Sequence, residues 1–340
     1  MSACFSLLLS LAAPPALASL EHELVHAPAH ASTRRFEALV EEGYRGGQLE
    51  VVMNDQPVPS AFLPALDLRS DDTHRLEWVE TRLSEPGAET ALFLRRYEEA
   101  AWSNEGSMSM EAQGQAAEEQ PWSVAADSPL VGQLLRCEAD ADGFEAEFAD
   151  EAVRGVDLDE LPADLGFAGL LPPEALAVGE GWEVEGERLA ILFRFTEGLA
   201  YEIDAEAREQ LGLEVDRIEV DGSLEFELRE VRGALAHCRV EGELERVVER
   251  PGDLTPVPVV DGTATDTETT LWRVEGSFVW DLEAGALHAL ELEGETEQAI
   301  ATVRDAGQPG PTYSSTFEVG GERRLSVSAS AEDEALRPAR

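Results

Sequence analysis

Alternation of apolar and polar residues is the main pattern in this chain, and it is clearest between residues 217 and 300. Leu224, Phe226 and Leu228 alternate with charged residues, and a second alternating run returns after Gly233. Two further runs flank a turn signal at Ala284-Gly285. A period of two is typical of strands with one buried and one solvated face, so we expect antiparallel strand pairs joined by tight turns.

The remaining pattern is less regular but also favours short elements. Residues 33–58 predict two extended segments around Gly46-Gly47, although the first also fits a helix. Asp142-Gly143 predicts a hairpin between residues 134 and 148. Leucines at helical spacing predict short helical turns over residues 157–171, and Asp204 and Gly212 bracket another short helix.

Together these patterns predict a mainly β or α+β fold, made of antiparallel twisted sheets with a few short helices. We expect two successive sheet units, residues 33–200 and 201–330, followed by a tail at 331–340. Residues 103–128 are polar and aperiodic, which predicts a loop within the first unit.

The clearest signals for turns and element boundaries lie in residues 169–186, GLLPPEALAVGEGWEVEG. Pro172-Pro173 ends a helical segment, and Gly179 and Gly181 precede a strand that begins near Trp182. These glycines lack the dinucleotide-binding fingerprint, which opens a helix and not a strand. The stretch therefore predicts a backbone corner and not a phosphate site.

The first eighteen residues carry no charge and contain an apolar run from Phe5 to Ala13. Ala16-Leu17-Ala18 fits the pattern of small residues before a signal-peptide cleavage site. The run is too short to span a bilayer as a helix. We therefore expect an exported protein, periplasmic or extracellular, with cleavage near Ala18, a flexible arm at residues 19–32 and no transmembrane segment.

The formal net charge of the 340-residue chain is −45, and all 25 basic residues are arginine. Such a field repels phosphate backbones, which excludes nucleic acid as a partner. The absence of lysine excludes Schiff-base chemistry and a phosphate-loop lysine. The favoured interpretation is a solvated acidic surface, and the alternative is stabilisation of that surface by calcium.

Two cysteines remain after the expected cleavage, Cys137 and Cys238, and both lie in strand-like contexts. An oxidising compartment permits one disulfide between them. Two buried free thiols fit the sequence equally well.

One literal metal motif is present: His22, Glu23 and His26 form HExxH, with His30 spaced as a third ligand. On a helix the two imidazoles share a face, so they would hold zinc while the glutamate activates water. Pro28 ends such a helix almost at once, and no strand precedes it. An inert arm is the favoured interpretation, and a zinc-dependent hydrolase is the alternative.

Other candidates are weaker. Residues 138–143 resemble the first half of a calcium loop, but Ala149 stands where the pattern requires glutamate, so a hairpin turn is favoured. His74 and His237 are isolated. His288 shares a face with Leu290 and Leu292, which predicts a partnered core histidine rather than a catalytic base. We assign no catalytic, cofactor-binding or metal-binding residue and no cofactor.

Several phrases in succession resemble a group of uncharacterised exported bacterial β-rich proteins that share an "LP…V.VG..W.V" motif. The phrases are LRRYEEA (94–100), SPLVGQ (128–133), DGFEAEF (142–148), LLPPEALAVGEGWEV (170–184) and the "G.F.WDLEAG.L" hairpin at 276–287. The resemblance implies export and a β-rich fold. It implies no established activity and no catalytic residues.

These observations lead to one functional hypothesis: a non-enzymatic, envelope-associated binding or structural domain. A concave sheet is suited to hold an apolar small ligand or an envelope partner, by analogy with carrier folds.

Overall fold

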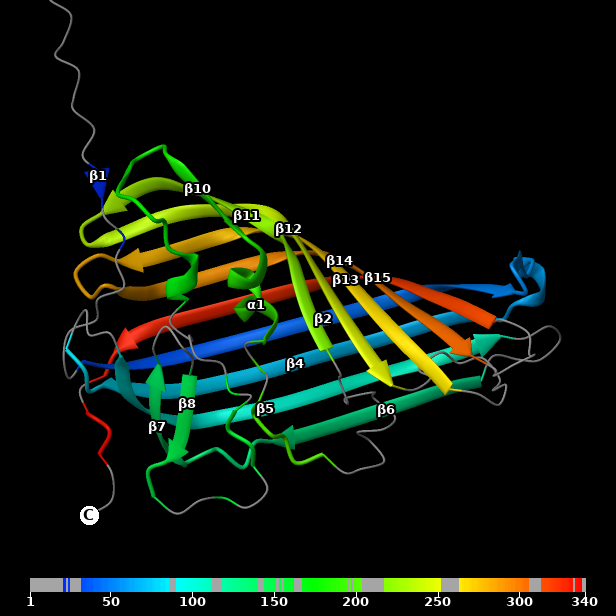
Figure 1. Cartoon of the computed structure of the whole chain (residues 1–340), viewed down its shortest axis with the longest axis horizontal. Helices are drawn as coiled ribbons and strands as arrows, with labels where there is room; N and C mark the ends of the chain where they lie inside the picture. Colours follow the sequence, from blue (N-terminus) through cyan, green and yellow to red (C-terminus); the bar gives the residue numbers. More distant parts are fainter. Residues whose placement is uncertain are drawn as a thin grey trace, which may run out of the picture.

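The computed structural model of this protein is dominated by one large antiparallel sheet of thirteen strands (Figure 1). The structure describes residues 21–22, 24, 32–85, 90–111, 118–139, 144–150, 153, 156–159, 161, 167–194, 196, 198–203, 217–251, 263–305, 313–332 and 334–337. The mainly β, antiparallel fold expected from the alternating pattern is confirmed.

The first half of the chain supplies β1 (Glu21–His22), β2 (Thr33–Met53), β3 (Gln56–Pro57), β4 (Ala65–Arg82), β5 (Ala91–Glu111), β6 (Glu118–Asp127), β7 (Leu134–Ala139) and β8 (Phe144–Phe148). The second half supplies β9 (Leu176–Ala177), β10 (Gly181–Glu185), β11 (Arg217–Arg232), β12 (Leu235–Pro251), β13 (Thr263–Asp281), β14 (Ala286–Asp305) and β15 (Tyr313–Ala331). Helical turns are short: η1 (Ser60–Phe62), η2 (Ala168–Leu170), η3 (Gly186–Leu189) and α1 (Ile191–Arg194).

The two halves of the chain are joined edge to edge in this sheet. Its order is β10-β11-β12-β13-β14-β15-β2-β4-β5-β7-β8, with β3 on β2 and β6 on β5. The join is the pairing of β15 with β2, which runs from Tyr313 opposite Met53 to Ala331 opposite Arg34. The two segments expected as successive sheet units are therefore parts of one hydrogen-bonded sheet.

The alternating runs form strands as the pattern predicts. Leu224, Phe226 and Leu228 are buried on the inner face of β11, and the charged residues between them point outward. Gly233 makes the turn into β12, and the expected hairpin at 276–287 joins β13 to β14. A single buried face per strand is what an antiparallel sheet with one solvated side requires.

The core lies on the inner face, at the end of the sheet that curls around α1 (Figure 1). Phe36 and Trp78 stack there with ring centroids 4.9 Å apart. Residues between 156 and 203 supply the other layer, including fully buried Phe167, Leu192 and Leu199. The inner face at this end is therefore packed with side chains from this segment.

A row of glycines crosses the inner face at mid-strand. It contains Gly222, Gly242, Gly276, Gly294, Gly321 and Gly106, on six of the long strands. A Cβ atom on Gly276 would lie 1.9 Å from the carbonyl oxygen of Glu291, and one on Gly294 would lie 1.8 Å from that of Arg273. Such close backbone approach needs glycine and is the usual means of bending a sheet sharply.

The predicted loop at residues 103–128 is wrong for the described residues. Ser103 to Glu111 continue β5, and β6 pairs with this part of β5 from Ala101 opposite Asp127 to Met110 opposite Glu118. The side chains are polar because much of this strand pair is accessible to solvent. Without a fully buried face, a strand loses the apolar alternation that would reveal it.

The predicted charged tail also makes specific contacts. Leu336 is buried on the outer face against Val79, Leu94 and Leu134. Its backbone N–H donates to Oγ1 of Thr81 at 2.9 Å. The tail therefore packs on the sheet at Leu336.

Candidate functional site

The outer face of the sheet carries a row of five glutamates in direct cross-strand register, which we call the glutamate ladder. Glu183 on β10 faces Glu225, and the row continues through Glu241 and Glu275 to Glu293 on β14. All five side chains are exposed. Neighbouring strands are about 4.8 Å apart, so the ladder spans roughly 20 Å across the strands.

Only one member of the glutamate ladder has an ion-pair partner among the described residues: Glu241 pairs with Arg239. Carboxylates directly opposite one another repel, and such pairs destabilise a sheet. A strand sequence selected for stability alone would alternate the sign of charge along this row. The glutamate ladder is therefore a local violation of sheet electrostatics, of the kind found at functional sites.

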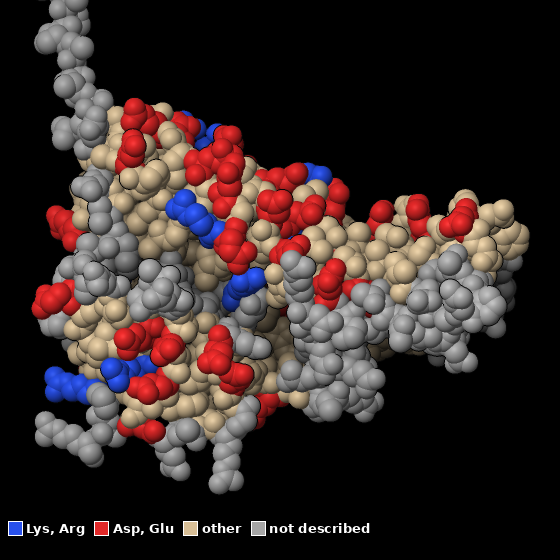
Figure 2. Space-filling model, viewed as in Figure 1, with Lys and Arg blue, Asp and Glu red and all other residues tan. Residues whose placement is uncertain are grey.

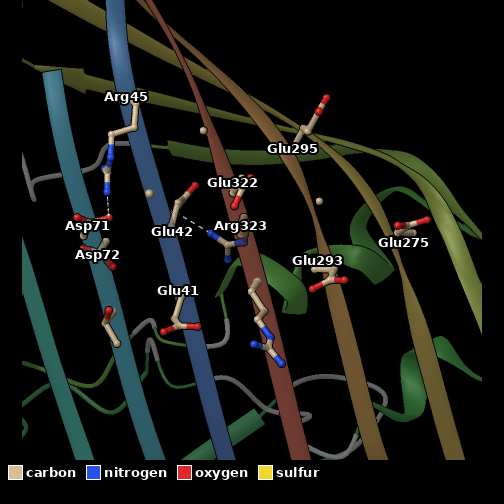
Figure 3. Close-up of a pocket in the computed structure, with 15 residues that line it drawn as sticks. Glu41, Glu42, Arg45, Asp71, Asp72, Glu275, Glu293, Glu295, Glu322 and Arg323 are labelled. Carbon is tan, nitrogen blue, oxygen red and sulfur yellow. Dashed lines mark hydrogen bonds and ion pairs between the residues drawn. The ribbon is translucent and has the colours of Figure 1, made fainter. Parts of the chain in front are cut away.

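A hollow of about 1080 Å³ adjoins the end of the glutamate ladder, beside Gly294 and Gly321 of the glycine row and next to β2 (Figure 3). Eight acidic and three arginine residues line it, together with Thr73 and three glycines: Glu41, Glu42, Asp71, Asp72, Glu275, Glu293, Glu295, Glu322, Arg45, Arg323 and Arg324. Arg45 pairs with Asp71 at 2.5 Å and Arg323 with Glu42 at 2.8 Å. Figure 2 shows that acidic side chains far outnumber arginines on the molecular face in view.

The inner face beneath this region holds a cluster of buried charges, which we call the arginine–glutamate cluster. Arg323 pairs with Glu42, and Arg246 pairs with Glu268 at 2.7 Å. The hydroxyl of Tyr44 donates to Glu42 at 2.5 Å. Burial, and then the charge of Glu42, raise the pKa of Tyr44 well above its usual value, so this residue is a neutral donor.

A second inner network is centred on His74. Its Nε2 lies 3.1 Å from Asp72, and its Nδ1 lies 3.1 Å from the hydroxyl of Tyr201. Trp102 and Asn104 also donate to Asp72, at 2.8 and 3.1 Å. Burial alone would raise the pKa of Asp72, but the hydrogen bonds from His74, Asn104 and Trp102 outweigh it and hold that pKa below its usual value.

The order Asp72–His74–Tyr201 has the connectivity of a carboxylate–base–nucleophile relay, yet its electrostatics oppose nucleophilic chemistry. Burial raises the pKa of Tyr201, and the negative charge of Asp72 raises it further. An activated nucleophile needs the opposite shift or a base that can remove its proton readily. The network instead ties residues 199–203 to the sheet, together with a hydrogen bond from the Ser128 hydroxyl to Leu199 O.

The predicted zinc motif is not helical where the structure describes it. His22 lies in β1, which pairs with β9 through His22 opposite Leu176, and Leu24 is buried in the core. Glu23 and His26 lie outside the described residues. These contacts also correct the expected flexible arm at His22 and Leu24.

The other sequence candidates have mixed outcomes. The hairpin favoured over a calcium loop is confirmed, because β7 and β8 pair through Ala139 opposite Phe144. The prediction that His288 is a core histidine is wrong, because a register shift between Val279 and Trp280 leaves its side chain exposed at a bulge. His237 is half-buried on β12. The helix expected after Asp204 lies outside the described residues.

Cys137 and Cys238, for which the sequence permitted a disulfide or free thiols, are both free and buried. Burial raises the pKa of Cys137 to about 11 and that of Cys238 to about 12. Both are therefore protonated at neutral pH and do not react as thiolates.

Residues 169–186 form a corner of the backbone, as predicted. It runs from η2 through β9 to β10, and Nε1 of Trp182 donates to the Leu170 carbonyl at 2.8 Å. Trp182 also stacks on Phe226 at 4.9 Å. Its glycines fit the backbone, since a Cβ on Gly181 would lie 2.6 Å from Phe226 O.

No protein-family model matches this chain, and no curated protein matches it. Similar solved structures include OccK7 (OpdD) of Pseudomonas aeruginosa, at 8% identity over 88% of this chain and 99% of that one, with a TM-score of 0.18. The InvG secretin-domain β-barrel of the Salmonella SPI-1 injectisome matches at 9% identity over 91% and 65%, with a TM-score of 0.18. An outer membrane channel of Pseudomonas putida F1 matches at 9% identity over 88% and 97%, with a TM-score of 0.15. At these TM-scores the likeness supports no conclusion about function, and membership in the exported bacterial group stays a prediction.

Among the described residues, no helix is long and apolar enough to cross a membrane. In the same part of the chain, no three His, Cys, Asp or Glu side chains converge on a metal-binding position.

Proposed function

We propose that this chain is a non-enzymatic, envelope-associated binding domain that recognises a cationic polypeptide on the outer face of its sheet. The observation that carries the proposal is the glutamate ladder. Its five carboxylates stand in direct register on five adjacent strands, and four have no ion-pair partner among the described residues.

Binding explains an arrangement that folding disfavours. Opposed carboxylates repel in the free protein, and a partner with closely spaced positive charges relieves that repulsion when it binds. Arginine-rich segments suit such a row, because each guanidinium can bridge two carboxylates through its fork of N–H donors.

The hollow gives this acidic surface a concave part that a partner can enter. With a volume of about 1080 Å³ and a mainly acidic lining, it is large enough for several side chains of a partner. It lies beside Glu275 and Glu293, so one extended segment can contact both the glutamate ladder and the hollow. A partner of that length has many charges to contribute, which favours it over a single metal ion.

The carrier version of the functional hypothesis receives no support from these features. Core side chains fill the curled end of the inner face. The hollow is lined mainly by charged groups. A second cavity, of about 380 Å³, is also lined largely by charged side chains: Glu183, Glu225, Glu227, Glu241 and Arg239.

Calcium binding by the glutamate ladder is the second candidate, because two opposed carboxylates supply the oxygen ligands that calcium prefers. The two candidates differ in a simple titration. An arginine-rich peptide is titrated into the protein at low ionic strength by calorimetry, with an acidic peptide of equal length as control, and calcium chloride is titrated separately. We expect saturable binding of the basic peptide that weakens with added salt. Absence of binding at low salt would refute the proposal, and saturable binding of calcium alone would favour the second candidate.

A further inference from the structure

Four buried hydrogen-bond donors gather on the inner face without an acceptor among the described residues. They are Nε of Arg246, Nε of Arg323, Nε1 of Trp272 and Oγ1 of Thr296. Trp272, Thr296 and Arg323 are each at least 95% buried. Native proteins pair nearly all such groups, so four in one place require an explanation.

The register of the sheet brings these donors together from four adjacent strands. Trp272 on β13 is directly opposite Thr296 on β14. Arg323 on β15 faces Gly294, the inner-face neighbour of Thr296 on the same strand. Arg246 on β12 faces Thr270, the inner-face neighbour of Trp272. The four residues therefore surround one point of the inner face.

The wall opposite this point is the ring of Phe193, at the end of α1. The guanidinium carbon of Arg323 lies 4.9 Å from the ring centroid, and that of Arg246 lies 5.5 Å from it. An aromatic face attracts a cation but offers no lone pair to an N–H donor. Phe193 thus covers the donors without satisfying them.

Charge and access both fit a small anion. Each guanidinium already holds one carboxylate, Glu42 for Arg323 and Glu268 for Arg246, so the charge of the cluster is balanced. The remaining Nε–H groups and an indole N–H can only donate, and the Thr296 hydroxyl can also donate, so together they offer four hydrogen bonds to an oxyanion. The side chain of Arg246 is 19% exposed, so the cluster reaches solvent there.

We propose that Arg246, Trp272, Thr296 and Arg323 form a binding site for a small oxyanion: sulfate, phosphate or the carboxylate of a larger ligand. The ring of Phe193 is its wall. The site is separate from the glutamate ladder, which lies on the opposite face of the sheet.

The test uses the full chain with sodium sulfate, sodium phosphate and sodium acetate, each compared with sodium chloride at matched ionic strength. A ligand that binds only the folded protein raises its melting temperature in a saturable way. We expect such a rise with sulfate or phosphate, or with acetate if the carboxylate is the true ligand. The anion whose effect on the melting temperature saturates at the lowest concentration identifies the chemistry of the ligand that the site prefers.

Two conservative variants locate the effect. Thr296→Val removes one donor and keeps the shape of the side chain, and Trp272→Phe removes one donor and keeps an aromatic ring, so both should lose most of the anion-induced shift while remaining folded in chloride. Thr316→Val, on the outer face of β15, is the matched control and should keep the shift. Phe193→Leu keeps an apolar core residue but uncovers both guanidinium faces, and should lower the saturating concentration several-fold.

Two results would overturn the proposal. One is the absence of any saturable shift beyond the chloride control in both the natural protein and Phe193→Leu, which would mean that buried water alone serves these donors. The other is an anion-induced shift that Thr296→Val and Trp272→Phe leave unchanged.

Discussion

Glu275 on β13 lies directly opposite Glu293 on β14, and neither carboxylate has an ion-pair partner among the described residues. Glu275 faces a second carboxylate, Glu241, on its other side. Replacement by glutamine removes both repulsions at once. We expect Glu275→Gln to stabilise the free protein by about 0.2–1 kcal/mol for each opposed pair at low salt.

The control for this prediction is Glu249→Gln on β12, which removes one exposed charge whose cross-strand neighbours are Arg217 and Thr267. Urea unfolding at two salt concentrations measures both variants. The gain for Glu275→Gln should shrink as salt screens the charges. A gain that is equal in both variants would show that only net charge matters.

The buried ion pair between Arg95 and Glu80 predicts a large loss of stability. The guanidinium of Arg95 is fully buried and donates to Glu80 at 2.8 Å. Glu80→Gln leaves that charge without its counter-ion, which should cost about 3–5 kcal/mol in the free energy of unfolding. Glu98→Gln, which breaks the half-exposed pair with Arg96, should change it by less than about 1 kcal/mol. Similar losses in the two variants would contradict this account.

The His74 network predicts how the stability of the folded protein changes at acidic pH. Because the folded-state pKa of Asp72 is lowered, its contribution is fully present above the unfolded value near 4 and is lost as pH falls through the folded pKa. Asp72→Asn should therefore be less stable than the natural protein at neutral pH, and the difference should shrink below pH ~4. Thermal unfolding as a function of pH measures it, with Asp55→Asn in the β2–β3 turn as control. A difference that is constant with pH would be evidence against the network.

The glycine row predicts that one added methyl group disrupts the bend. Gly276→Ala forces its Cβ against the Glu291 carbonyl at 1.9 Å, so the backbone must shift, at a cost of about 1–3 kcal/mol or more. Gly320→Ala places a methyl where nothing lies within 4 Å and should be tolerated. Chemical denaturation of both variants decides the point, and equal losses would mean that the row does not set the bend.

The sequence predicted the parts of the fold that depend on local pattern. The strands around Leu224 and Phe226, the β7–β8 hairpin and the corner at Trp182 each follow from residues close together in the chain. The loop prediction for residues 103–128 is wrong because the described strands there have no fully buried face. The prediction for His288 is wrong because a bulge between Val279 and Trp280 shifts the alternation. Register shifts of this kind leave no local signal.

The candidate sites depend on pairings between distant segments, which alternation does not reveal. Tyr201 meets His74 across 127 positions of sequence. Glu183, Glu225 and Glu275 are three among 70 acidic residues until the register of three strand pairs aligns them. The alternation predicts that these glutamates face outward, but only the register shows that they face one another.

The most direct test of the account compares two sets of four glutamate-to-glutamine changes that remove the same charge. The ladder variant changes Glu225, Glu241, Glu275 and Glu293, and the control variant changes Glu50, Glu111, Glu249 and Glu318, which are exposed and face no carboxylate across the strands. The measurement is the dissociation constant for an arginine-rich peptide at low ionic strength. We predict at least a tenfold weakening in the ladder variant and a much smaller change in the control variant. Equal weakening in the two variants would contradict the claim that the glutamate ladder is a binding surface.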